Sequence, residues 1–514
     1  MLTTRRSFDG PSSKETEKRW LALAGISLTS FLACLDFTIV NTALPAMQSS
    51  LHAAMDQLQW VINLFLLAQC TFMVTAGRLA DLYGRRLVLF IGMAGFGLTS
   101  LGAGLATSMW ILLLFRFGQG LCTAILFTAS AAIISNAFPE SERGRALGLL
   151  FGVNGIGLAV GPVIGGLITG ALSWHWVFLV NIPLIVVSFM ICIPTINESR
   201  QSDTTARIDW SGLIFLTVGL SSLILALIQG QQWGWSSIPT LLLIAISLIT
   251  LFILYIVEKR TESPIIDFRL FKNMTFIGSI VATFSLSCFY CLAFFLMPLY
   301  LHYIHGFSGY TLGLMLLPTT AIMAIMSPIV GRATDYFGPK PLLIVGMLFF
   351  IASALMQLGF KAHTSITYLI VAFVAMGVGW AAIISPSTVA TLSTVSESRS
   401  GQALGTSWTF HNMGGVISLS LGTIIYQSVA VSTFLKQTII APVNITSEWI
   451  QEAVSNPEVA IRIITQHSHA SIDQAQSLFN HCFLHGFHGA MLFLVVIMVC
   501  SLIAIITLIR AKQP

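Results

Sequence analysis

Fourteen apolar runs follow one another along this chain of 514 residues. A helix of about 20 apolar residues is long enough to cross the hydrocarbon core of a bilayer. Charged residues make up only 9% of the chain, whereas they make up about 25% of soluble proteins. The sequence therefore predicts an all-α polytopic membrane protein. The predicted spans cover residues 20–45, 57–77, 87–106, 109–136, 146–171, 174–195, 209–229, 236–257, 275–302, 310–330, 341–360, 364–392, 402–430 and 486–509.

Lysine and arginine are distributed unequally between the two sets of loops. With the N-terminus inside, 21 of them fall in cytoplasmic segments and 3 in outer segments. Such an excess is typical of the cytoplasmic side of membrane proteins. An odd number of spans would break this alternation, so fourteen spans with both termini in the cytoplasm are predicted. Residues 1–19 lack a small-residue cleavage site and are interpreted as a cytoplasmic tail, not a signal peptide.

One loop pattern occurs twice. The segments Gly77 to Arg86 and Gly331 to Lys340 share two glycines, an aspartate and a final basic residue at the same spacing, after the second and the tenth span. Two such halves around a mid-membrane cavity are a transporter architecture. The predicted divisions are a tail at 1–19, a six-helix half at 20–195, a linker with two inserted helices at 196–258, and a second six-helix half at 259–511 that contains a long periplasmic loop at 431–485.

Asp36 and Arg116 are full charges inside apolar runs. Asp36 lies about eight residues before the outer end of its span and Arg116 about seven after the outer start of its own. Both therefore lie about 10–12 Å below the outer surface, where an ion pair would favour the ionised carboxylate. A charge at this depth usually marks an ion or substrate path, which predicts a proton-coupling site. A static pair that only fixes helix packing is the alternative. Gln119 shares a helix face with Arg116.

Glycine recurs through the fifth span, at positions 152, 155, 157, 161, 165, 166 and 170, together with Pro162. Bare glycine backbone lets a neighbouring helix approach closely, and proline removes one helix hydrogen bond. The run predicts a tight, bent interface of the kind that a rocking transporter needs. Ordinary small-residue packing is the alternative.

Histidine is concentrated at the outer boundary of the predicted spans. His411 is the exception among 11 histidines, because it lies inside the thirteenth span. With Asn412, Asn41 and Gln119 it is a candidate for lining the cavity, and a packing polar pair is the alternative for His411 and Asn412. His481, His485 and His488 share one helical face that could hold a metal. Solvated loop histidine is commoner, so no metal site is predicted.

These stretches resemble the major facilitator superfamily, and within it the fourteen-span drug:proton antiporters. The matching positions are Leu35 to Pro45 in the first span, the Gly77 to Arg86 loop, Leu112 to Gly120, Gly157 to Gly166, Trp174 to Pro183, and Pro264 to Phe271. Leu82 and His175 stand where the family pattern has arginine. The resemblance implies an exporter motif at Gly157, Gly161, Pro162, Gly165 and Gly166. It also implies a conformational switch at Gly77, Asp81, Gly84, Arg85 and Arg86, repeated at Gly331, Asp335 and Gly338.

The role of Asp81 can be stated more closely. Its carboxylate can accept from basic residues or from a helix N-terminus. In relatives this acid is thought to brace the closed cytoplasmic side against the other half, where the matching helix begins near Gln402. The alternative is a solvated loop that only sets topology.

The function that we predict is proton-driven export of drugs or other amphiphilic small molecules across a bacterial inner membrane. The sequence has no P-loop and no catalytic serine, histidine and aspartate set, so neither an enzyme nor a cofactor is predicted. A dedicated exporter of an endogenous metabolite such as a siderophore is the alternative, and a channel or transporter-derived sensor is less favoured. The expected partners are the small-molecule substrate, protons and the bilayer, without nucleic acid. A periplasmic adaptor and an outer-membrane channel are further candidates.

Overall fold

The computed structural model describes residues 13–51, 55–199, 209–261, 264–307, 309–438 and 471–509. Within these ranges the chain is helical and contains no strand. The helices are α1 (Ser13–Leu51), α2 (Met55–Tyr83), α3 (Arg85–Gly104), α4 (Met109–Ala137), α5 (Glu140–Ala171), α6 (Trp176–Leu179), α7 (Asn181–Thr195), α8 (Trp210–Trp233), α9 (Ile238–Glu258), η1 (Leu270–Lys272), α10 (Met274–Tyr303), α11 (Gly309–Phe337), α12 (Pro339–Leu358), α13 (Ile366–Leu392), η2 (Glu397–Arg399), α14 (Ser400–Thr438) and α17 (Ile472–Leu508).

Fourteen helical segments in the described ranges are long and apolar enough to cross a membrane. The short α6 and α7 together make one of these segments, Trp176–Thr195. The predicted fold class and the predicted number of spans are confirmed. The residue boundaries of the tail, linker and halves stay predictions.

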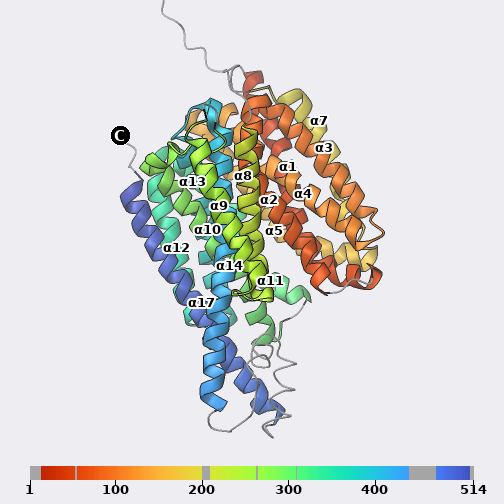
Figure 1. The fold of residues 1–514 in the computed structure, drawn as a ribbon, viewed down its shortest axis with the longest axis vertical. Helices are drawn as coiled ribbons and strands as arrows, with labels where there is room; N and C mark the ends of the chain where they lie inside the picture. Colours follow the sequence, from red (N-terminus) through yellow and green to blue (C-terminus); the bar gives the residue numbers. More distant parts are fainter. Residues whose placement is uncertain are drawn as a thin grey trace, which may run out of the picture.

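The helices before α8 lie on one side of the bundle and those after α9 on the other (Figure 1). The two most extensive crossings between the groups are those of α5 with α11 and of α2 with α14, and α4 with α14 and α5 with α13 add smaller ones. The hairpin of α8 and α9 packs between the groups, where α8 contacts both α2 and α14. The junction between the groups therefore depends on a few long helices.

Both copies of the repeated loop fold alike. Gly84 and Gly338 adopt φ values of 109° and 79° between consecutive helices, in the left-handed region that glycine enters at little cost. The last basic residue of each loop donates a hydrogen bond to the C-terminal end of the last helix in its own group, which is α7 for the first loop and α17 for the second. Arg86 donates to the Ile193 carbonyl at 3.0 Å, and Lys340 donates to the Ile506 carbonyl at 2.8 Å. A cation at a helix C-terminus is stabilised by the helix dipole.

Helices α14 and α17 extend beyond the predicted spans. Part of the predicted loop at 431–485 is therefore helical, and its residues 439–470 lie outside the described part of the chain. Aromatic side chains of the extension are packed: the ring of Phe483 lies 5.6 Å from that of Tyr426 in the predicted span, and Phe479 is buried. The extensions contain polar residues, so a prediction based on runs of apolar residues ends the spans too early.

Candidate functional site

A buried ion pair lies inside the helices that precede α8. Nη1 of Arg116 on α4 lies 2.6 Å from Oδ2 of Asp36 on α1, and the two side chains are 1% and 0% exposed. At such exposure neither charge is solvated by water, so each depends on the other and on nearby hydrogen bonds. The structure thus places the two predicted residues in direct contact.

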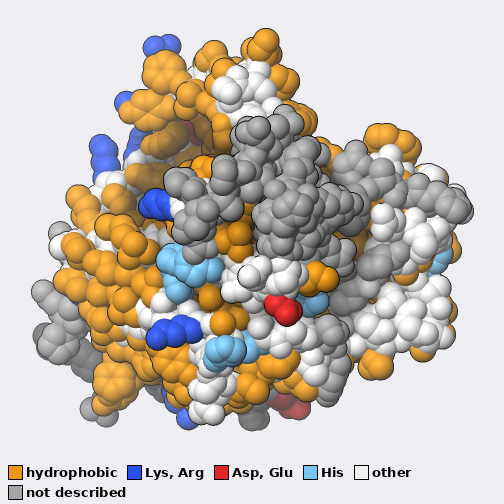
Figure 2. All heavy atoms as spheres, turned by 90° about the horizontal axis from the view of Figure 1, so that it is seen from below, with side chains coloured by type: hydrophobic (Ala, Val, Ile, Leu, Met, Phe, Trp, Pro, Cys, Tyr) orange, Lys and Arg blue, Asp and Glu red, His pale blue; other side chains and the backbone are white. Residues whose placement is uncertain are grey.

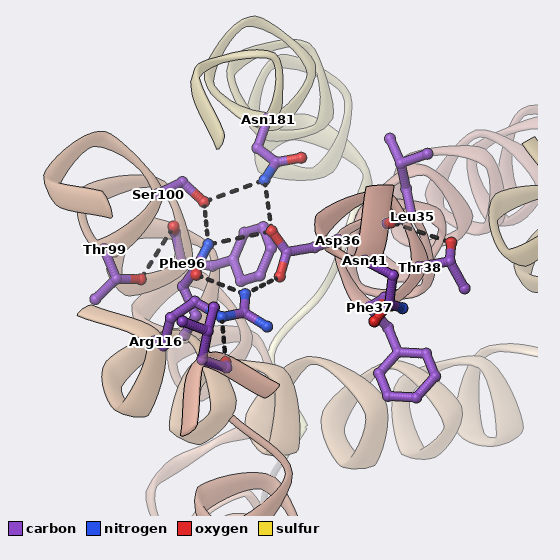
Figure 3. A network of polar contacts seen from close by, with 12 residues as sticks. Leu35, Asp36, Phe37, Thr38, Asn41, Phe96, Thr99, Ser100, Arg116 and Asn181 are labelled. Atoms are coloured by element: carbon purple, nitrogen blue, oxygen red, sulfur yellow. Dashed lines mark hydrogen bonds and ion pairs between the residues drawn. The ribbon is translucent and has the colours of Figure 1, made fainter. Parts of the chain in front are cut away.

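Three polar side chains from neighbouring helices complete this network (Figure 3). The amide of Gln119 donates to Asp36 Oδ1 at 3.3 Å and to the Ser100 hydroxyl at 2.8 Å. The amide of Asn181 donates to the same Asp36 oxygen at 3.1 Å. Gln119 also accepts from Arg116 at 2.9 Å. Five side chains from α1, α3, α4 and α7 therefore share one buried network. The sequence argument included Gln119 but missed Ser100 and Asn181.

The guanidinium of Arg116 has further partners. Its Nε donates to the Val61 carbonyl at 3.0 Å, and its Cζ lies 4.4 Å from the centre of the Phe65 ring. A desolvated cation over an aromatic face gains roughly 2 kcal/mol. These contacts come from α2, so a movement of α2 would change how firmly Arg116 holds Asp36.

A second carboxylate joins the two sides of the bundle. Asp81, at the end of α2, accepts hydrogen bonds from the backbone N–H groups of Gly401 and Gln402 at 3.0 and 2.7 Å. These groups belong to the first turn of α14, where the helix dipole favours an anion. We call this contact the Asp81 clamp. It lies where the sequence argument expected a helix start near Gln402.

The repeated loop forms a matching contact. Asp335, at the end of α11, accepts from the backbone N–H groups of Gly144 and Arg145 at 2.6 and 2.8 Å. Gly144 and Arg145 lie in the first turns of α5, and we call this contact the Asp335 clamp. Each clamp therefore joins the loop of one group of helices to a helix start of the other group.

Glycine makes both clamps possible. A Cβ at Gly77 would meet the Gly401 backbone, and a Cβ at Gly331 would meet the Gly144 backbone. Side chains larger than hydrogen would therefore hold the helices too far apart for the aspartates to reach.

Arg85 strengthens the Asp81 clamp. Arg85 pairs with Asp81 at 2.6 Å and also donates to the Glu397 carbonyl at 2.6 Å, across the junction. Pro339 stands at the corresponding position of the second loop. Arg86 does not cross the junction, because its contacts lie on α3 and α7.

The glycine face of α5 packs on α1 beside Asp36. A Cβ at Gly157 would meet Phe31, and one at Gly161 or Gly165 would meet Thr38 or Thr42. Added atoms at these three positions would separate the two helices. The other two residues of the predicted exporter motif, Gly166 and Pro162, have different surroundings. Gly166 has nothing within 4 Å of its Cβ position, and Pro162 is exposed.

His411 lies among aromatic rings between the two groups of helices. Its Nδ1 lies 2.9 Å from the Thr283 carbonyl, so this nitrogen carries the proton and donates. Its ring centre lies 4.9 Å from that of Trp408 and 5.8 Å from that of Tyr290. Trp408 in turn stacks on Phe127 of α4 at 5.9 Å. Aromatic contacts thus continue from α4 through α14 to α10.

Two further candidates lie apart from this aromatic cluster. The side chain of Asn412 lies 3.1 Å from the sulfur of Met73 on α2. Asn41 is exposed and its amide donates to the Phe37 carbonyl at 3.3 Å. Asn41 does not contact the Asp36 network (Figure 3).

Several histidines gather at the end of the bundle opposite the clamps (Figure 2). His305 lies 3.1 Å from the Tyr300 hydroxyl, and partial burial together with neighbouring His363 lowers its pKa. The rings of His481 and His485 are 4.4 Å apart. No set of three or more potential metal ligands comes together among the described residues.

Similarity to known proteins identifies the family. The model of the Major Facilitator Superfamily matches residues 26–419 and 275–511. The chain belongs to this superfamily. It is 30% identical over 479 residues to the multidrug resistance protein Stp of Mycobacterium tuberculosis (strain CDC 1551 / Oshkosh), covering 92% of this chain and 88% of Stp.

Two further proteins extend the comparison. The tetracenomycin C resistance and export protein of Streptomyces glaucescens is 30% identical over 415 residues, which cover 81% of this chain and 76% of that protein. The crystal structure of the human organic anion transporter MFSD10 (TETRAN) superposes with a TM-score of 0.57 at 14% identity, covering 93% of this chain and 99% of that one. This likeness concerns the fold alone. The expected resemblance to a family of membrane transporters is confirmed.

Proposed function

We propose that this chain is a proton-coupled exporter of drugs or other amphiphilic small molecules, located in a bacterial inner membrane with both termini in the cytoplasm. The observation that carries the proposal is the buried Asp36 carboxylate held by Arg116. The drug-resistance relatives support the substrate class, and the excess of basic residues supports the orientation. The clamps then lie on the cytoplasmic side, and the described state is closed on that side.

The energy of the ion pair suits proton coupling. Removing one partner of a buried ion pair costs about 3–5 kcal/mol. Moving one charge through 100 mV of membrane potential supplies about 2.3 kcal/mol. Protonation of Asp36 removes its charge, leaves Arg116 without a counter-ion, and so weakens the network by an amount comparable to the driving force. The clamped state contains the intact ion pair, and an incoming proton on Asp36 would destabilise that state.

Helix α5 supplies a route from the ion pair to the clamps. It begins at the Asp335 clamp and then passes over α1 on both sides of Asp36 through Gly157, Gly161 and Gly165. A change in α1 on protonation of Asp36 would therefore move α5 and strain the hydrogen bonds of the Asp335 clamp. Helix α2 carries the Asp81 clamp and also contacts Arg116. Both clamps are thus mechanically connected to the ion pair.

We place the substrate beside His411, Tyr290 and Trp408, between the two groups of helices. Stacked aromatic rings suit planar aromatic compounds and organic cations. The first experiment is uptake of a panel of dyes and antibiotics by energised inverted vesicles from a host that lacks its own pumps. Accumulation that collapses when the pH gradient is dissipated supports the proposal. Downhill flux alone, with no accumulation of any compound, would contradict it.

A further inference from the structure

A cavity of about 540 Å³ opens beside the Asp81 clamp. Its wall combines α2, α9, the segment 264–272, η2 and α14. Its lining residues are Arg78, Tyr255, Glu258, Lys259, Thr261, Pro264, Asp267, Phe268, Arg269, Phe271, Lys272, Arg399 and Gln402. The ion-pair network, the aromatic cluster and the glycine face have no residue in this lining.

The charges of the lining are unbalanced. Five basic side chains face two acidic ones. Asp267 already pairs with Arg399 at 3.3 Å. Among the described residues, Lys259, Arg269 and Lys272 have no ion pair, and all three are exposed. The rim therefore carries positive charge available to an anionic ligand.

Glu258 gives the cavity a second polar feature. It is 4% exposed, and its Oε1 accepts from the Ile265 N–H at 3.2 Å. Its Oε2 has no hydrogen-bond partner among the described residues. Buried polar atoms are rarely left unpartnered in native structures. An O–H or N–H group of a ligand would satisfy this oxygen.

The surroundings of the cavity are apolar and largely exposed. Only 17% of α9 is buried, the lowest fraction among the fourteen spans of the described chain. The rings of Tyr255, Phe268 and Phe271 form a continuous row, with centres 5.2 and 6.0 Å apart. The segment 264–272 buries Ile265 and exposes Arg269 and Lys272. This alternation is typical of amphipathic segments at a membrane interface.

We propose that this cavity binds the headgroup of an anionic phospholipid. The phosphate lies between Lys259 and Arg269, a headgroup hydroxyl donates to Glu258, and the acyl chains follow the outer face of α9. A glycerol headgroup, as in phosphatidylglycerol, satisfies both the positive rim and the unpartnered oxygen. A soluble phosphate ester shares part of this chemistry but has no acyl chains to contact α9.

The same cavity is connected to the Asp81 clamp. The Gln402 side chain donates to the Pro264 and Ile265 carbonyls at 2.9 and 2.8 Å, while its backbone N–H donates to Asp81. Opening the clamp would therefore disturb the cavity wall. A bound lipid favours the clamped state, because that state preserves the cavity.

The test uses the full-length purified chain in detergent, titrated with dioctanoyl phosphatidylglycerol, phosphatidylethanolamine or phosphatidylcholine, and separately with glycerol 1-phosphate or inorganic phosphate. Binding is followed by native mass spectrometry. Phosphatidylglycerol should bind more tightly than every other probe. Each basic side chain near a membrane surface contributes roughly fivefold in affinity for an anionic lipid. Lys259→Gln with Arg269→Gln should therefore weaken phosphatidylglycerol binding by about 25-fold.

A matched control removes two exposed charges outside the cavity lining, Arg260→Gln and Arg332→Gln. It should keep the affinity of the unmodified chain. Lys272→Gln alone, with an expected loss of roughly fivefold, serves if the first pair of substitutions impairs folding. Equal losses in the control and the cavity variants would overturn the proposal. Equal binding of phosphatidylethanolamine or of inorganic phosphate would overturn it as well.

Discussion

Asp81 and Asp335 occupy equivalent positions in the two copies of the repeated loop, and each accepts two backbone N–H hydrogen bonds near the start of a helix on the opposite side of the bundle. Four backbone N–H groups are satisfied in this way. Two acids in different parts of the chain therefore join the two groups of helices at the same end of the protein. Arg85 pairs with Asp81, and Pro339 stands at the corresponding position of the second loop, so the two loops differ at this position.

Asp81→Asn should open the clamped end without loss of the protein from the membrane. A hydrogen bond to a charged group is worth about 1.5–3 kcal/mol, so weakening two of them should shift the closed population by at least tenfold. Labelling of Ser400→Cys, whose side chain is buried at the start of α14, measures the opening. Unchanged labelling in Asp81→Asn would remove the proposed bracing role. Asp335→Asn tests the second clamp in the same assay and should also raise labelling.

The glycine face of α5 offers a matched pair of substitutions. Gly161→Ala places a methyl group against Thr38, whereas Gly166→Ala places one in open space. Alanine favours a helix over glycine by about 1 kcal/mol, so Gly166→Ala should keep or raise thermal stability and keep transport. Gly161→Ala should impair transport. Equal transport by both variants would reduce the motif to ordinary packing.

Topology can be tested at opposite ends of the bundle. Ser236, between α8 and α9, is exposed, as is Ser396 before η2. With Cys500 replaced, since it is the one fully exposed cysteine among eight, a membrane-impermeant maleimide added to intact cells should label Ser236→Cys and not Ser396→Cys. Labelling of Ser396→Cys from outside would contradict the orientation.

The sequence predicted the parts of the site that depend on a single helix or on charge. Equal depth in two apolar runs indicated that Asp36 and Arg116 could meet, and they do. Ser100 and Asn181 were missed, because an uncharged polar residue in a span has no pattern of its own and its partners depend on helix rotation. The signal available for Asn181 was its position inside an apolar run.

The repeated loop allowed one further prediction that was not made, a second aspartate contact with a helix. Since Asp81 was expected to reach a helix start, the same spacing at Asp335 should have predicted a second contact at Gly144. Glu258 was missed for another reason. It falls one residue beyond a predicted span, where a charge looks solvated. In the fold it is buried, with Ile265 and the start of α8 at Gly212 lying against it.

Arg116→Ala should raise the pH optimum of transport. Without the guanidinium, Asp36 remains buried with no counter-charge, so the protonated form is favoured and proton release requires a higher pH. A lower optimum would contradict this account. A purely structural pair predicts instead that each single variant is lost from the membrane and that Asp36→Asn combined with Arg116→Ala restores it.

The most direct measurement concerns Asp36 itself. The unmodified chain and Asp36→Asn are reconstituted in proteoliposomes with a dye selected for export by the unmodified chain, and accumulation against a concentration gradient is followed under an imposed pH gradient. Asp36→Asn keeps the size of the side chain but cannot carry a proton. The account predicts that accumulation driven by the pH gradient is lost, while dye binding, measured by fluorescence quenching, is retained. Full proton-driven accumulation by Asp36→Asn would contradict it.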